Sequence, residues 1–288
     1  MDGIVVLLKP PGMTSSNAVY DARRIFSEKR AGHLGTLDPA AAGVLPVCFG
    51  RATRLFDLLV DKDKEYLFEI AFGIKTDTQD AQGSELARDD RAVSEDELRA
   101  VLPRLTGEQA QTASVYSALK VGGRKMYDLA RAGEAVEPKT RRVTIHSLEL
   151  MRRTGENRFL LKTVCSRGTY VRSLCESIAA ELGTVAYMPF LLRARSGPFM
   201  LKQSVTIREL EEAKSGGALA GTLVSCEEAL AFLPEARLEA DRLTPTKNGL
   251  DTCVPGLPDG PLRVYAGGMF LGLGFAASGR LKLKVHLY

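Results

Sequence analysis

The sequence predicts a first domain in which helices and strands are interspersed, followed by a small all-β module. The chain has 288 residues, more than the ~100–200 residues of one average domain. Its first part contains both helical periodicity and strand-like alternation of apolar residues. From about Leu238 onward, glycine and proline interrupt short apolar segments, a pattern typical of small β modules. The domain boundary is therefore expected between Ser215 and Glu239.

The first elements follow from the hydrophobic pattern. The β-branched apolar run over residues 3–8 predicts a buried strand. Thr14 and the two serines after it offer N-caps for a helix that extends to about Glu28. The stretch AGHLGTLDPAAAGVLP, residues 31–46, is then expected as a loop that leads into a second strand.

The later elements are predicted by the same tests. Residues 52–62 have helical spacing, and residues 64–75 alternate like a strand with Tyr66 on its apolar face. Ser94 and Glu97 have the spacing of a capping box at a helix start. The remaining expectations are strands near 142–151 and 158–166, a helix over 170–183, and a closing strand and turn in FLLRARSGPF.

Charge is concentrated in one segment. The net charge of the chain is +4, but residues 120–153 alone contain nine Lys or Arg and four Asp or Glu, a net +5. A local basic excess is the footprint expected for a polyanion such as nucleic acid. The alternative is an ordinary solvated surface with excess cations.

Several classes of protein are excluded by missing patterns. The five cysteines are scattered without a C-x-x-C pair, and there are three histidines, which disfavours a disulfide scaffold and a structural zinc site. Motifs of P-loops, serine hydrolases and zinc proteases are absent. The apolar run near the start is too short for a signal peptide or a membrane span.

One carboxylate stands alone in residues 31–46. Pro39 holds Asp38 in extended geometry, because the helical region is disfavoured before proline. Gly35 and Gly43 allow tight turns or the close approach of a ligand on either side. A carboxylate on a rigid loop with space beside it suits a nucleophile or a base. The alternative is an Asx-turn, in which Asp38 only caps a helix starting at Pro39.

Two further clusters carry candidate chemistry. DKDKEYLFEI presents Tyr66 at the start of a strand, and SRGTYVRSL presents Tyr170 and Arg172 at the start of a helix. An arginine beside Asp38 would keep that carboxylate ionised, as a nucleophile requires. A tyrosine can stack on a base and also form a hydrogen bond. The alternative is two amphipathic core tyrosines and a surface arginine.

Together these segments resemble one family. AGHLGTLDPAAAGVLP looks like the signature of the bacterial tRNA pseudouridine-55 synthases, the TruB family. The seven matches span residues 7 to 199, and the C-terminal tail resembles, more weakly, the RNA-binding PUA module. The six other matching segments are LLKPPGMTS, KEY, TDTQDAQG, VYSALKVGGRKMYDLARAG, SRGTYVRSL and LLRARSGPF.

The resemblance implies an α+β fold and a domain plan. It implies a pseudouridine-synthase catalytic domain over residues 1–230, with a mixed, mostly antiparallel central sheet flanked by helices. A basic RNA-binding insertion is expected at about 115–142, and a small all-β PUA-like module at 235–288.

The implied activity is isomerisation of uridine 55 in the T-loop of tRNA to pseudouridine. The base flips out, its glycosidic bond breaks with the help of an aspartate, and the bond forms again through C5. The resemblance implies no metal and no organic cofactor. It implies the T-arm stem-loop of tRNA as partner, without a membrane or a required protein partner, for a cytoplasmic monomer.

The resemblance also implies residue roles. Asp38 is the catalytic aspartate and Arg172 its ion-pair partner, while Lys9 supports the pocket or a phosphate and Asp80 helps to order the site. Basic residues in the insertion are expected to contact phosphates, which positions RNA without reading its sequence. These are Lys120, Arg124, Lys125, Arg141 and Arg142.

Four further residues are implied to bind the substrate base. Tyr66 stacks on the flipped uracil, Tyr170 and Leu191 complete the pocket, and His33 occupies the space that the uracil leaves. The family usually has two arginines after this leucine, whereas one stands here after Leu192, so the two leucines are alternatives for the pocket position.

Two other functions stay open. A non-catalytic RNA-binding or folding protein would use His33, the basic insertion and the C-terminal module in the same way but without chemistry. A glycosidase-like hydrolase would pair Asp38 with Asp77 or Asp80, and would need a defined separation of the two carboxylates.

Overall fold

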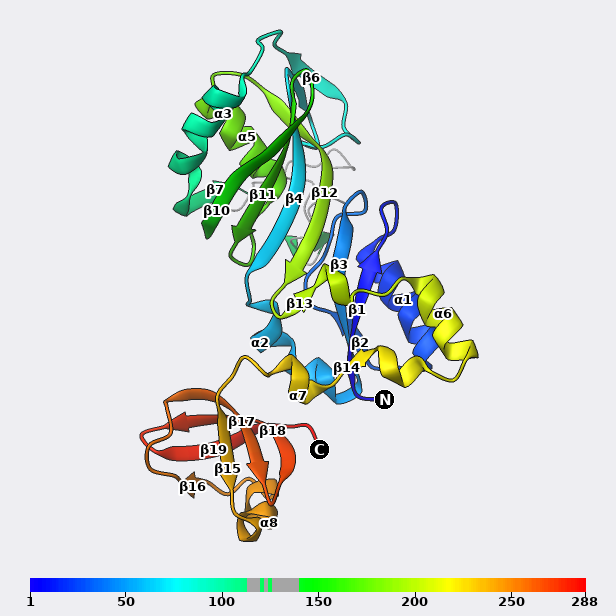
Figure 1. The fold of residues 1–288 in the computed structure, drawn as a ribbon, viewed down its shortest axis with the longest axis vertical. Helices are drawn as coiled ribbons and strands as arrows, with labels where there is room; N and C mark the ends of the chain where they lie inside the picture. Colours follow the sequence, from blue (N-terminus) through cyan, green and yellow to red (C-terminus); the bar gives the residue numbers. More distant parts are fainter. Residues whose placement is uncertain (113–119, 122–123, 126–139) are drawn as a thin grey trace.

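The computed structural model describes residues 1–112, 120–121, 124–125 and 140–288. A mixed sheet with the strand order β14-β1-β3-β12-β4-β11-β10-β7 forms the centre of the first part, with β2 beside β3 and β13 beside β12 (Figure 1). Its strands are β1 (Gly3–Lys9), β2 (Ala31–His33), β3 (Ala42–Phe49), β4 (Lys64–Phe72), β7 (Gly107–Thr112), β10 (Thr140–Gly155), β11 (Arg158–Cys165), β12 (Ala186–Ser196), β13 (Phe199–Met200) and β14 (Leu223–Val224).

The strands of this sheet pair mostly in antiparallel fashion, as the resemblance to the family implied. Strand β12 is antiparallel to β4 but parallel to β3, where Leu192 lies opposite Ala42 and Arg193 opposite Gly43. This β3–β12 seam joins the segment that carries Asp38 to a strand about 150 residues later in the chain.

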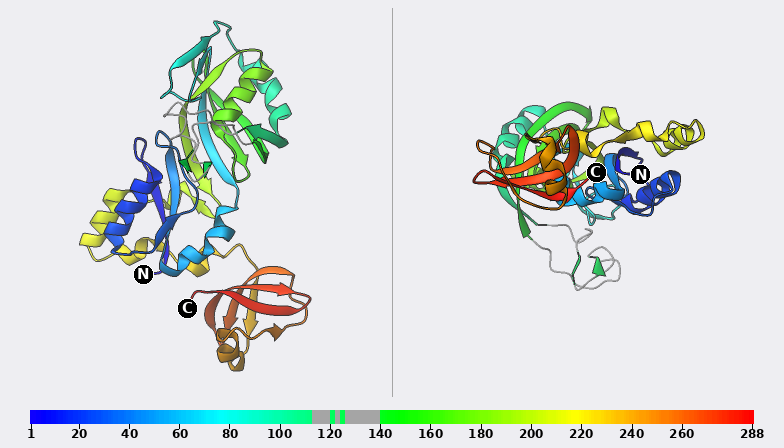
Figure 2. Two further views of the ribbon diagram at one scale, coloured as in Figure 1. Left: turned by 180° about the vertical axis from the view of Figure 1, so that it is seen from behind. Right: turned by 90° about the horizontal axis from the view of Figure 1, so that it is seen from below.

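Helices cover the sheet in two groups. Helices α3 and α5 lie against the part with β10 and β12, and α1 lies beside α6 near β1 (Figures 1 and 2). The α-helices are α1 (Ser15–Phe26), α2 (Phe56–Val60), α3 (Glu95–Val101), α5 (Val171–Glu181), α6 (Ile207–Ser215) and α7 (Cys226–Ala229). Four 3₁₀ turns join them, η1 (Gly50–Leu55), η2 (Leu102–Leu105), η3 (Leu201–Gln203) and η4 (Leu219–Thr222).

The local start signals of two helices are confirmed. The Thr14 side chain accepts a hydrogen bond from the Asn17 amide, and Ser94 forms a full capping box with Glu97. These caps satisfy amide donors that the first turn of a helix leaves without a partner.

Other local expectations need correction. Residues 31–46 do not begin as a loop, because β2 covers the first three residues, whereas the second strand expected at the end of this stretch is confirmed as β3 from Ala42. Asp38 does not cap a helix, since its carbonyl accepts the Ala41 amide at 3.1 Å in a turn and no helix follows within the described residues of this segment. The helix expected over 52–62 is the turn η1 followed by the short α2.

A second sheet forms the C-terminal module, in the order β15-β17-β18-β19-β16 (Figure 1). Its Phe270 and Val285 pack against a core cluster of the first part that contains Ile4 and Leu34, so the two parts share an apolar contact. The helix α8 (Leu243–Lys247) and turn η5 (Ala240–Arg242) were not expected in an all-β module. The strands are β15 (Glu235–Leu238), β16 (Thr252–Cys253), β17 (Gly260–Ala266), β18 (Met269–Ala277) and β19 (Arg280–His286).

Two hairpins of the described residues lie outside both sheets. The hairpins are β5 (Ile74–Thr76) with β6 (Glu85–Arg88) and β8 (Lys120–Val121) with β9 (Arg124–Lys125). All five cysteines are free thiols, of which Cys253 is exposed and the other four are buried. Within the described ranges no helix combines the length and the apolar character needed to cross a membrane.

Candidate active site

A cavity of about 360 Å³ opens next to the β3–β12 seam. It brings together seven residues that the sequence predicted from separate motifs, namely His33, Asp38, Tyr66, Arg141, Tyr170, Arg172 and Leu191. Its full lining is His33, Gly35, Thr36, Leu37, Asp38, Phe56, Val60, Lys64, Tyr66, Arg141, Arg167, Gly168, Thr169, Tyr170, Val171, Arg172, Leu191 and Arg193.

The loop that carries Asp38 is fixed by the start of α1. The Ser15 hydroxyl accepts a hydrogen bond from the Leu37 amide at 2.9 Å and donates one to the Leu37 carbonyl at 3.0 Å. The Gly12 amide donates to the Pro39 carbonyl at 2.8 Å. The residues on either side of Asp38 are therefore held by backbone contacts, while its side chain remains 37% exposed toward the cavity.

Lys9 lies beneath this loop and does not line the cavity. Its side chain is fully buried, and its Nζ donates hydrogen bonds to the carbonyls of Pro10, Met13 and Pro39 at 2.8, 2.7 and 3.2 Å. Burial lowers the pKa of Lys9 from its usual 10.5 to about 8. The structure thus places Lys9 where it braces the loop that carries Asp38.

Arg172 is the ion-pair partner of Asp38 in this geometry. Its Nη2 lies 3.0 Å from Oδ2 of Asp38, and its Nη1 lies 3.8 Å from Oδ2 of Asp80. Nη1 also donates a hydrogen bond of 2.9 Å to the Thr78 carbonyl. The Arg172 side chain is only 4% exposed, and its contacts with Thr78 and Asp80 hold it where it can position the Asp38 carboxylate at the cavity.

Asp80 supports Arg172 from behind the cavity. Its Oδ1 accepts hydrogen bonds from the Thr78 hydroxyl at 2.7 Å and from the Gln82 amide at 3.0 Å. The Asp80 carbonyl also accepts the Thr76 hydroxyl at 2.8 Å. The carboxylate is thereby fixed in its turn and does not reach the cavity.

Tyr66 and Leu191 also line the cavity, and they come from the paired strands β4 and β12. Tyr66 is buried, and this burial raises the pKa of its phenol, so the hydroxyl stays protonated at neutral pH. Leu191 lines the cavity, whereas Leu192 does not, so Leu191 occupies the pocket position. His33 lies at the edge on β2, where burial lowers the pKa of its imidazole.

Tyr170 is held on both its backbone and its ring. Its amide donates to Oε1 of Gln111 at 2.6 Å, and its carbonyl accepts from Nε2 of the same side chain at 2.9 Å. The guanidinium of Arg141 lies 5.0 Å from the ring centroid and donates to the phenol oxygen at 3.3 Å. Gly168 next to Tyr170 has a φ of +88°, a backbone conformation that favours glycine, and a Cβ there would also lie 2.9 Å from Nη1 of Arg141.

Of the other basic residues predicted to bind RNA, the structure describes the side chain of Arg142, which is not brought to the cavity. The Arg142 side chain is 85% exposed and lies 3.9 Å from Glu108, away from the cavity lining. The side chains of Lys120, Arg124 and Lys125, and most of the insertion at about 115–142, lie outside the described residues.

Arg193 is the main site residue that the sequence reasoning missed. It is 1% exposed and donates hydrogen bonds to the carbonyls of Val44 at 2.8 Å, Gly35 at 3.0 Å and Thr36 at 3.3 Å. Gly43 was expected to admit a ligand, but it admits the Arg193 backbone instead, since a Cβ there would lie 2.3 Å from the Arg193 carbonyl oxygen. The sequence held one signal for this role, a charged residue that directly follows two leucines in an expected strand.

Several more cavity residues were not predicted, and three of them carry an aromatic or cationic side chain, namely Phe56, Lys64 and Arg167. Burial lowers the pKa of Lys64 to about 8, and the neighbouring Arg193 and Arg167 act in the same direction. Among the described residues, no three His, Cys, Asp or Glu side chains come close enough to form a metal site. The cavity therefore combines one ion-paired carboxylate with a buried phenol and several cations, which suits acid–base or nucleophilic chemistry on an anionic substrate.

Family models match most of the first part of the chain. Residues 23–171 match the model described as TruB family pseudouridylate synthase (N terminal domain). Residues 172–231 match the model described as tRNA pseudouridylate synthase B C-terminal domain.

Curated relatives match nearly the whole chain. A tRNA pseudouridine synthase B from Pelotomaculum thermopropionicum is 44% identical over 93% of this chain and 86% of that protein. The protein of the same name from Azoarcus sp. is 40% identical over 99% of this chain and 94% of its own length.

Solved structures share the fold, including the C-terminal module. A chain of an H/ACA RNP bound to a substrate RNA containing 2′-deoxyuridine matches with a TM-score of 0.77 at 24% identity, over 99% of this chain and 85% of that chain. A chain of a Cbf5-Nop10-Gar1 complex matches with a TM-score of 0.74 at 27% identity, over 95% of this chain and 78% of that chain.

Proposed function

This chain belongs to the TruB family of pseudouridylate synthases, and from that premise we propose that it isomerises uridine 55 in the T-loop of tRNA to pseudouridine. Pseudouridylation of tRNA is the activity of its curated relatives at 40–44% identity over most of the chain, and this chain is a tRNA pseudouridine synthase of the same kind. The choice of uridine 55 rests on the signature AGHLGTLDPAAAGVLP and the six accompanying motifs.

The proposed reaction replaces one glycosidic bond by another and exchanges one proton. The C1′–N1 bond of the uridine breaks, the uracil turns, and a C1′–C5 bond forms. The proton on C5 leaves and N1 gains a proton, so no redox partner is needed. Asp38 either adds to the ribose or removes a ribose proton, and both routes require an ionised carboxylate beside the sugar.

The observation that carries this proposal is the ion pair between Arg172 and Asp38. At 3.0 Å and with the arginine buried, this pair holds the Asp38 carboxyl group in place on the cavity lining. In the proposed complex, the uracil ring stacks on Tyr66 between Tyr170 and Leu191. The protonated phenol of Tyr66 can then donate to the base or move a proton near C5.

Base flipping gives His33 its proposed role. Extruding a stacked base costs a few kcal/mol, and a side chain that fills the vacated space offsets part of that cost. His33 lies at the cavity edge on β2, and burial keeps its imidazole neutral at neutral pH. A neutral aromatic ring of this kind can stack inside the T-loop in place of the uracil.

The remaining parts of the proposal concern binding. The catalytic domain over residues 1–230 acts with its basic insertion at about 115–142, and the PUA-like module over 235–288 binds RNA. Arg141 and Arg142 contact phosphates, together with Lys120, Arg124 and Lys125. The protein acts as a monomer on the T-arm of tRNA in the cytoplasm, without a protein partner.

The hydrolase alternative is less favoured by this site. Glycosidases use one protonated and one ionised carboxylate around the scissile bond. Here the Arg172 guanidinium stands between the Asp38 and Asp80 carboxyl groups, at 3.0 Å and 3.8 Å, so the two do not face each other across a substrate bond. Asp80 also does not reach the cavity.

The test is tritium release from T-arm RNA labelled with [5-³H]uridine. The wild type should release tritium, Asp38→Asn should not, and replacing the target uridine by cytidine should abolish release. Asp57→Asn serves as a matched control, because Asp57 is an exposed carboxylate on α2. Free uracil in the products would support a hydrolase, and T-arm binding without tritium release would support a non-catalytic RNA-binding protein.

A further inference from the structure

Phe56 is an exposed aromatic side chain within the catalytic cavity. It is the first residue of α2, 41% of it is exposed, and it lines the same cavity as Asp38. Val60, one turn later on the same face, also lines the cavity, whereas Leu59 is buried in the core beneath. The core contact of Leu59 therefore turns Phe56 and Val60 toward the cavity.

The helix that carries Phe56 is braced at its other end. Nζ of Lys64 donates hydrogen bonds to the carbonyls of Val60, at 2.5 Å, and Lys62. A cation at the last carbonyls of a helix is also favoured by the helix dipole. The backbone that carries Phe56 is therefore held in place, which lowers the entropy cost of binding a ligand against the Phe56 ring.

The charges around Phe56 suit a nucleic acid. Lys64 and Arg167 line the cavity with Phe56, and Asp38 is the one carboxylate among the described residues of the lining. Proteins that bind single-stranded nucleic acid combine such cations with aromatic rings on which bases stack. An isolated exposed phenylalanine on a protein surface is ordinary, but one inside a cationic RNA cavity is not.

The cavity is also larger than one base requires. Its volume of about 360 Å³ lies in the range of about 300–1,000 Å³ that holds a whole drug-sized ligand. A single pyrimidine ring therefore leaves part of it unfilled. Lys64 precedes Tyr66 by two residues on the same face of β4, so it lies about 7 Å along the strand from the proposed uracil site.

We propose that Phe56 stacks on a second nucleobase of the RNA, next to the target uridine, with Arg167, whose side chain is 55% exposed, facing the phosphates between the two. The inference rests on the proposed function and adds a base-binding subsite to it. The subsite takes any unstacked base, because every base has a face that can stack.

The test couples a protein change to an RNA change. Phe56→Ala is made in the Asp38→Asn protein, so that the RNA is not converted, and binding is measured by fluorescence anisotropy. The RNAs are an intact T-arm stem-loop and a set in which each loop nucleotide in turn lacks its base. Phe56→Ala should weaken binding of the intact RNA roughly 5- to 150-fold. It should have no effect on the one RNA that lacks the stacked base.

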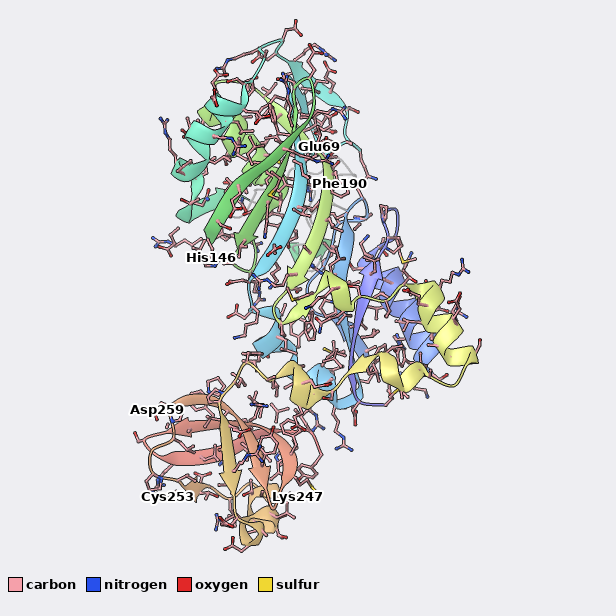
Figure 3. The ribbon with its side chains drawn as sticks, in the orientation of Figure 1. Glu69, His146, Phe190, Lys247, Cys253 and Asp259 are labelled. Atoms are coloured by element: carbon pink, nitrogen blue, oxygen red, sulfur yellow. The ribbon has the colours of Figure 1, made fainter. Side chains whose placement is uncertain are left out.

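Matched variants separate stacking from general loss of apolar surface. Phe190, labelled on β12 in Figure 3, is 44% exposed and does not line the cavity. Phe190→Ala should leave binding of every RNA unchanged, and Phe56→Tyr should retain the affinity that Phe56→Ala loses. Thermal unfolding of each variant checks that the fold is intact.

Three results would overturn the inference. They are equal weakening of every abasic RNA by Phe56→Ala, no weakening of any RNA, and coupling only to the target uridine itself. The proposed function is judged separately by tritium release from the wild type. Release without coupling at Phe56 would remove the subsite and leave the proposed function standing.

Discussion

The guanidinium of Arg193 donates a hydrogen bond of 3.0 Å to the carbonyl oxygen of Gly35, three residues before Asp38. The same side chain also reaches the carbonyls of Thr36 and Val44. A residue of β12 therefore shapes the loop that presents the carboxylate. Arginine can do this because its planar fork offers five donors in fixed directions.

Replacing Arg193 by lysine should lower the turnover number more than the RNA affinity. A single ammonium cannot reach three separated carbonyls, so the loop would no longer hold the Asp38 carboxylate in its position. A misplacement of about 1 Å at a reacting group can cost about 10²-fold in rate. Single-turnover tritium release and T-arm binding measure the two effects. Arg195→Lys is the control on the same strand, and a fully active Arg193→Lys enzyme would contradict the argument.

Gly43→Ala should destabilise the protein strongly. At φ +116° a side chain is strained, and the new Cβ would lie 2.3 Å from the Arg193 carbonyl oxygen. Relief requires β3 and β12 to separate at their seam, for which we expect a loss of about 3 kcal/mol or more. Urea unfolding measures this loss. Gly32→Ala, with nothing within 4 Å of its Cβ, should change stability by less than ~0.5 kcal/mol.

Asp80→Asn should reduce turnover about tenfold, equivalent to ~1.4 kcal/mol, with little change in RNA affinity. The amide can still accept the bonds from Thr78 and Gln82, but it removes the charge 3.8 Å from Arg172. Without this charge, the orientation of Arg172 that pairs with Asp38 is less strongly stabilised. Asp77→Asn is the matched control, since the Asp77 carboxylate accepts the Ser84 amide instead. Equal loss in both variants would contradict this reasoning.

A site residue could be predicted from the sequence where it lies in a short recognisable motif, but not where its role depends on contacts with a distant segment. Asp38, Tyr66 and Arg172 lie in short motifs whose order along the chain is visible in the sequence, and the structure gathers them around one cavity. Arg193 was missed because its partners lie about 150 residues away, and only the β3–β12 pairing brings them together. Phe56 was missed because its sequence context reads as an ordinary amphipathic helix.

The fold shows the same division. Helix starts at Thr14 and Ser94 were predicted from capping side chains, which act within one turn. The order of strands in the sheet, with the parallel β3–β12 contact, depends on contacts between distant segments. The short α8 was missed because it contains Pro245 and lies among Gly- and Pro-rich segments that indicate strands and turns.

Lys9 should give the protein a distinctive stability profile at alkaline pH. Its folded-state pKa is about 8, lowered from 10.5 by burial. Between these values the unfolded chain binds more protons at Lys9 than the native state does, so this residue makes stability rise with pH from about 8 to 10.5. Below pH 8 both states hold the proton, and the cost of burying the charged ammonium is present in full.

Comparison with Lys9→Met isolates this contribution, because the variant lacks the titrating group but keeps a side chain of similar length. The free energy of unfolding of the wild type minus that of Lys9→Met should increase between pH 8 and 10, by at most ~1.4 kcal/mol per pH unit. Urea unfolding at closely spaced pH values measures the slope. A difference that stays flat or falls over this range would mean that burial does not disfavour the charged ammonium. The three carbonyls around Nζ would then compensate fully for the lost water.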